Sequence, residues 1–99
     1  MSDETFGDYI RKAREAKDLP LRKVAAHLDI DTSTLSKVER GERSASLDYL
    51  KPLSDILELD LKEVQTTYIA AKITKDLGGL EHLSEGLKKV EEQILKKKK

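Results

Sequence analysis

The chain has 99 residues and a mass of 11.2 kDa, which is the size of one ordinary domain. Hydrophobic residues make up 37% of it, charged residues 38% and aromatic residues only 4%, which favours a small helical protein with much exposed surface. The absence of cysteine excludes thiolate metal sites, iron–sulfur clusters, redox pairs and disulfides.

Net charge identifies no partner, because 19 lysines and arginines balance 19 aspartates and glutamates. No apolar run reaches the roughly 18 residues that would span a bilayer. Residues 1–5 are acidic, whereas a signal peptide begins with basic residues. We therefore expect a soluble cytoplasmic protein without a membrane partner, and a disordered N-terminus over residues 1–5.

Three helices are predicted in the first half of the chain. The first, over residues 6–17, has apolar residues at helical spacing, namely Phe6, Tyr9, Ile10 and Ala13. The second, over residues 21–28, has Pro20 in its first turn and turns Val24, Ala25 and Leu28 inward. After a tight turn, the third helix runs over residues 32–40 with Asp31 as its N-cap, Leu35 and Val38 inward, and Gly41 as its stop.

Three more helices are predicted after a polar connection. Ser46 is expected to cap a fourth helix whose inward residues are Leu47, Leu50, Leu53 and Leu57, although Pro52 interrupts that pattern. A fifth helix runs from an Asp60 cap to Leu77, where Gly78 and Gly79 end it. After these glycines, Leu80, Leu83, Leu87, Val90 and Ile94 are spaced alternately three and four residues apart, which predicts a sixth helix with a heptad-like apolar face. No alternating strand pattern occurs, so the predicted fold class is all-α.

The second and third helices form the arrangement with the clearest functional meaning. Two short helices joined by a tight turn, the second presenting small polar and basic side chains, are typical of a helix-turn-helix that places one helix in the DNA major groove. The sequence LRKVAAHLDIDTSTLSKVERG, residues 21–41, resembles the lambda-repressor-like (XRE) family of DNA-binding domains. The resemblance covers about residues 6–60. It implies a five-helix DNA-binding domain, here over residues 6–68.

The resemblance also implies roles for individual residues. Double-stranded DNA would be read at base edges by Thr32, Ser33, Ser36 and Lys37, and lysine donates to guanine O6 and N7. Phosphates would be bound by Arg22, Lys23, Arg40 and Arg43. Glu39 is expected to brace the domain through Arg14. The chain departs from the family pattern where Leu21 replaces a phosphate-binding glutamine, where Asp29 replaces a turn glycine, and where Asp31 replaces a hydroxyl cap.

The apolar residues spaced by three and four after Gly79, here called the leucine seam, are expected to form a dimer interface. One DNA-reading helix gives too little specificity, and such domains bind as two-fold dimers. Residues 69–95 would form this C-terminal extension and residues 96–99 a basic tail. The seam residues are Leu80, Leu83, Leu87, Val90 and Ile94. Packing of the seam against Val64, Tyr68 and Ile73 of the same chain is the alternative.

Function is thus expected to be transcriptional regulation by a homodimer on a two-fold operator. The residues around the turn also resemble regulators associated with restriction-modification systems. The alternative is a protein-interaction module, such as an antitoxin or adaptor whose C-terminal helices bind another protein. His27 and His82 lie far apart and lack neighbouring ligands, so we expect no metal or cofactor. No catalytic arrangement is suggested, and we expect no enzyme.

Overall fold

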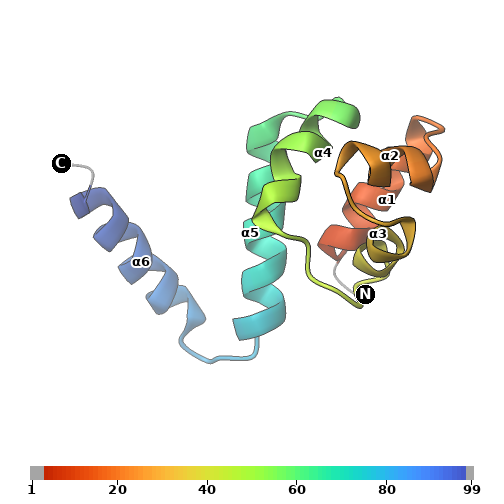
Figure 1. Cartoon of the computed structure of the whole chain (residues 1–99). Coiled ribbons are helices and arrows are strands. Elements are labelled where there is room, and N and C mark those ends of the chain that lie inside the picture. Colours follow the sequence, from red (N-terminus) through yellow and green to blue (C-terminus); the bar gives the residue numbers. More distant parts are fainter. Residues whose placement is uncertain (1–3, 98–99) are drawn as a thin grey trace.

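The computed structural model describes residues 4–97, and every regular element in that range is a helix. Figure 1 shows α1 to α5 gathered around one core, while α6 stands apart at the end of a short loop. The predicted all-α class is therefore confirmed. The elements in chain order are α1 (Phe6–Ala16), α2 (Leu21–His27), α3 (Thr32–Glu39), the 3-10 turn η1 (Leu47–Tyr49), α4 (Leu50–Ile56), α5 (Leu61–Leu77) and α6 (Leu83–Lys97).

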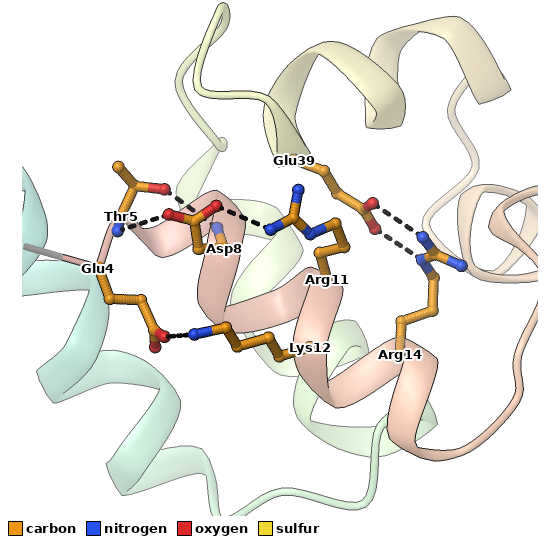
Figure 2. Close-up of polar contacts among 7 residues, drawn as sticks. All are labelled: Glu4, Thr5, Asp8, Arg11, Lys12, Arg14 and Glu39. Atoms are coloured by element: carbon orange, nitrogen blue, oxygen red, sulfur yellow. Dashed lines mark hydrogen bonds and ion pairs between the residues drawn. The ribbon is translucent and has the colours of Figure 1, made fainter. Parts of the chain in front are cut away.

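The start of α1 is fixed by a reciprocal capping box. The backbone N–H of Asp8 donates to Thr5 Oγ1 at 3.0 Å, and the Thr5 N–H donates to Asp8 Oδ2 at 3.3 Å (Figure 2). The hydrogen bonds from Thr5 also lower the pKa of the Asp8 carboxyl group. Residues 1–3 of the segment expected to be disordered lie outside the described residues, whereas Thr5 holds a defined position.

The core contains the side chains that the helical spacing turns inward. Leu35 and Val64 are fully buried, and Ile10, Val24, Ala25 and Leu53 are almost so. The remaining buried apolar side chains are those of Phe6, Leu28, Val38, Ala45, Leu50, Leu57 and Tyr68. These residues join α1 to α5 into one body, so the helix-turn-helix rests on the other three α-helices of that body.

The fourth helix differs from its prediction. Ser46 is an N-cap, but it caps η1 by accepting from the Asp48 N–H, and α4 begins only at Leu50. Leu47 consequently remains 70% exposed, so its predicted inward position is wrong. The later start also explains why Pro52 is tolerated: it lies in the first turn of α4, where backbone N–H groups have no partner within the helix.

The last helix also differs from its prediction. It begins at Leu83, so Leu80 lies in the preceding loop, 61% exposed, and is not part of the helical seam. No residue of α6 is buried, and the alternative in which it packs against α5 of its own chain does not occur in residues 4–97. Among these residues, no helix has the length and apolar character needed to cross a membrane.

Gly7 is required where α1 meets the end of α3. A Cβ atom at this position would lie 2.4 Å from the Val38 carbonyl oxygen and 2.5 Å from that of Glu39. Since both contacts are with backbone, Gly7→Ala should force the helices apart and lower the free energy of unfolding by about 1–3 kcal/mol, as overpacking does. Urea denaturation measures this loss. Gly79→Ala is the control, because nothing lies within 4 Å of its Cβ position. Equal effects would contradict the close approach.

Candidate nucleic-acid interface

The turn between α2 and α3 is held by one residue with a left-handed backbone conformation and one apolar side chain that packs against the core. Asp29 has φ +58°, which replaces the glycine of the family pattern at modest cost. Ile30 follows, half-buried against the core, and its N–H donates to the Ala25 carbonyl at 3.0 Å. Leu35 and Val38 then fix α3, so the opposite face of α3 is left to solvent.

That outer face carries the predicted base-reading residues. Thr32, Ser33 and Lys37 are exposed, and Ser36 is half-buried. These positions share one side of α3, because residues three and four apart stack along a helix. The Ser36 hydroxyl oxygen accepts a hydrogen bond from Arg40 Nη1 at 2.6 Å, which leaves its own hydrogen free to donate. The arrangement offers hydroxyl and ammonium donors to a major groove.

An ion pair inside the domain braces α3 against α1. Arg14 Nε donates to Glu39 Oε2 at 2.8 Å and Arg14 Nη2 to Glu39 Oε1 at 3.0 Å (Figure 2). The Arg14 side chain is 15% exposed and that of Glu39 6%. Arg14 Nη1 also donates to the Leu19 carbonyl at 2.9 Å. Donation of these hydrogen bonds to the Glu39 carboxylate raises the pKa of Arg14. The expected partnership of Glu39 with Arg14 is confirmed.

The predicted phosphate-binding residues lie at the edges of this face. Arg22 and Lys23 are exposed in the first turn of α2. Arg40 is the C-cap of α3, and Arg43 follows on the exposed segment after Gly41, whose φ of +78° ends the helix. Tyr68 fixes this segment to α5, because its hydroxyl donates to the Ala45 carbonyl at 3.2 Å in a buried contact.

The contact of Glu42 with Arg40 was not predicted from the sequence. Glu42 Oε2 accepts from Arg40 Nε at 2.6 Å, and this hydrogen bond lowers the pKa of Glu42 and raises that of Arg40. The two residues lie two apart beyond a helix end, a spacing that helical periodicity does not single out. A phosphate that bound Arg40, as predicted, would therefore have to replace Glu42, whose carboxylate adds negative charge beside the outer face of α3.

Glu42→Gln should consequently strengthen binding to every duplex rather than to one sequence. The substitution frees Arg40 and removes a charge that repels phosphates, so we expect roughly twofold to tenfold tighter binding at low salt. Fluorescence anisotropy with two unrelated duplexes measures the change. Glu15→Gln, at an exposed position of α1, is the control. Unchanged affinity for both duplexes would contradict a role of Glu42 in holding Arg40.

Asp31 differs in part from its expected role. It is the N-cap of α3 by position, but its carboxylate makes no capping hydrogen bond and is exposed. An exposed carboxylate at the start of the predicted base-reading face would repel nearby phosphates. Among residues 4–97, no three His, Asp or Glu side chains gather in a way that would hold a metal ion.

The remaining predicted site residues lie on α6, except Leu80, which lies in the loop before it. Leu87 is 42% exposed, Val90 50% and Ile94 49%, while Leu83 is half-buried at the start of the helix. With Leu80 removed from the helix, the α6 seam consists of Leu83, Leu87, Val90 and Ile94. Their side chains share one apolar face of α6, which is exposed at Leu87, Val90 and Ile94.

Comparison with known proteins gives two further findings. The family described as Helix-turn-helix matches residues 10–64, which contain all of α2, α3 and α4 and parts of α1 and α5. A curated relative, Control protein C.MunI from Mycoplasma sp, is 37% identical over 60 residues, which cover 60% of this chain and 81% of that protein.

A solved structure resembles a larger part of the chain. The clp gene regulator ClgR from Corynebacterium glutamicum has a TM-score of 0.59 and 23% sequence identity, and the match covers 88% of this chain and 86% of that one. At this identity the likeness shows a shared fold.

Proposed function

The chain belongs to the helix-turn-helix family of lambda-repressor-like (XRE) DNA-binding transcriptional regulators, and from this premise we propose that it binds a two-fold operator as a homodimer. Thr32, Ser33, Ser36 and Lys37 read bases, while Arg22, Lys23, Arg40 and Arg43 bind phosphates. The observation that carries this assignment is the exposed polar face of α3, set on a fully buried Leu35. The protein acts by occupying DNA.

Homodimerisation is supported by the α6 seam, because Leu87, Val90 and Ile94 are exposed and no residue of α6 is buried within residues 4–97. A single α3 contacts only a few base pairs, and two copies related by a two-fold axis double the reading surface. The similarity to a control protein, together with the residues around the turn, supports a role in controlling a restriction-modification system.

Selection of binding sites from a random duplex library tests this function. The purified protein should enrich a two-fold motif whose half-site centres lie about 10 base pairs apart, or a multiple of that spacing. Enrichment of a single unpaired half-site would contradict the homodimer. Failure of the folded protein to enrich any motif at low salt would contradict sequence-specific regulation and favour the alternative, in which the uncovered α6 seam binds a different protein.

A further inference from the structure

The hydroxyl group of Ser36 differs from two other helical hydroxyls in the direction of its hydrogen bond. Ser54 Oγ and Thr66 Oγ1 donate to a carbonyl three residues earlier in their own helices, at 2.7 and 3.2 Å. Ser36 Oγ instead accepts from Arg40 Nη1 at 2.6 Å, and no acceptor for its hydrogen is found among residues 4–97. Since a hydroxyl group carries one hydrogen, that hydrogen is available to donate outside the chain.

Arg40 is held from two directions. Its Nε donates to Glu42 Oε2 at 2.6 Å, while its Nη1 donates to Ser36. A guanidinium group is planar, so these two contacts fix the orientation of the whole group. The Arg40 and Glu42 side chains are 53% and 54% exposed, so an anion from outside can reach the place that the carboxylate occupies.

Ser36 and Arg40 lie on the outer face of α3, together with Ser33 and Lys37. Successive residues of a helix are rotated by about 100°, and residues three and four apart therefore share one side. The fully buried Leu35 marks the opposite side. Because Arg40 is the C-cap of α3, its guanidinium lies at the end of the face on which Ser36 stands one turn earlier.

We propose that Arg40 positions Ser36 for base reading while it binds phosphate: a phosphate oxygen replaces Glu42 on Nε, and Nη1 continues to hold Ser36 as a hydrogen-bond donor. This inference rests on the DNA-binding function proposed above and assigns the polarity with which Ser36 reads. A donor in the major groove pairs with guanine O6 or N7, adenine N7 or thymine O4, and it meets another donor at cytosine N4. One of the two orientations of a G·C pair is therefore disfavoured.

The shared guanidinium links the phosphate contact to base reading. Arginine suits this task because its N–H groups donate in several fixed directions, whereas lysine carries a single ammonium group. In the free protein Glu42 holds the guanidinium in the orientation that the phosphate needs, so little conformational freedom is lost on binding. Arg40 thus contributes to discrimination between sequences without contacting a base.

Base preference measured together with salt dependence tests this proposal. Each base pair of one half-site in the selected duplex is changed singly, and every duplex is titrated with the wild type and three variants. Ser36→Ala should reduce discrimination at one base pair by roughly threefold to tenfold, the effect of losing one hydrogen bond. Arg40→Met should reduce discrimination at the same base pair and lower the salt slope by about one. Arg43→Met, the matched control, should lower the salt slope equally and leave base preference unchanged.

A double variant separates positioning from simple attraction of phosphate. Ser36→Ala and Arg40→Met remove the same contact by this account, so their combination should reduce discrimination no further than Ser36→Ala alone. Losses of discrimination that multiply in the double variant would overturn the proposal, because the two side chains would then act independently.

The remaining outcomes distinguish this proposal from the function on which it rests. If Arg40→Met weakened every duplex alike, as Arg43→Met should, Arg40 would bind phosphate only and its positioning role would be overturned. Unchanged base preference in Ser36→Ala, or equal binding of the two orientations of G·C at the base pair that Ser36 reads, would overturn the donor assignment. Failure of the folded wild type to enrich any motif would overturn sequence-specific binding itself.

Discussion

Glu39→Ala should lower the free energy of unfolding by about 3–5 kcal/mol, the cost of removing one partner from a buried ion pair. The Arg14 side chain is only 15% exposed, and the substitution removes the carboxylate that now accepts two of its hydrogen bonds, at 2.8 and 3.0 Å. The pair joins α1 to the end of α3, so the substitution also removes the contact that holds α3 in place against α1. Urea denaturation followed by circular dichroism measures the loss.

Asp55→Ala is the matched control for this prediction. Asp55 pairs with Lys51 at 2.6 Å, but both side chains are more than half exposed, and such surface pairs contribute little. A double-mutant cycle with Arg14→Ala isolates the pair itself. If Glu39→Ala lowered the free energy of unfolding no more than Asp55→Ala does, the claim that the Arg14–Glu39 pair stabilises the packing of α1 against α3 would be contradicted.

Leu87→Asp should convert the protein from dimer to monomer and weaken operator binding roughly a hundredfold or more, because the second half-site is then no longer bound intramolecularly. Leu87 lies in the middle of the α6 seam, and a carboxylate there cannot be buried without a partner. Sedimentation gives the mass and anisotropy gives the affinity for the selected duplex.

Leu95→Asp is a matched control on the same helix. Leu95 is also a large exposed apolar residue, at 58%, but its position lies outside the steps of three and four that define the seam. Its substitution should leave the mass at the dimer value. A dimer that survives Leu87→Asp, or one that Leu95→Asp dissociates equally well, would move the interface away from the seam.

The features that the sequence predicted well depend on local spacing. The inward residues of α1, α2 and α3, the cap of Asp60 on α5 and the stop at Gly41 all follow from helical periodicity and cap chemistry, and each is confirmed. The pair of Arg14 and Glu39, 25 residues apart, came instead from the family resemblance. Periodicity alone does not connect such distant positions.

The features that the sequence missed depend on tertiary placement. A pocket beside α5 is lined by residues from the segments 4–7, 38–45 and 66–76, whose proximity no local pattern shows. Glu42 meets Arg40 only because the chain turns after α3. Leu80 continues the heptad spacing of α6 but precedes its first turn, since the chain leaves α5 through the loop that follows Gly78. Hydrophobic spacing marks an apolar face without marking where the helix begins.

The central claim is that the exposed face of α3 reads bases, and Lys37→Ala tests it most directly. Affinities of the wild type and the variant are measured for the selected duplex and for each single-base change within one half-site. The variant should lose about 1–3 kcal/mol for the preferred duplex and its discrimination at one base pair, while Arg43→Ala weakens all duplexes alike and reduces the salt dependence. Uniform weakening of every duplex by Lys37→Ala, with unchanged base preference, would contradict the claim.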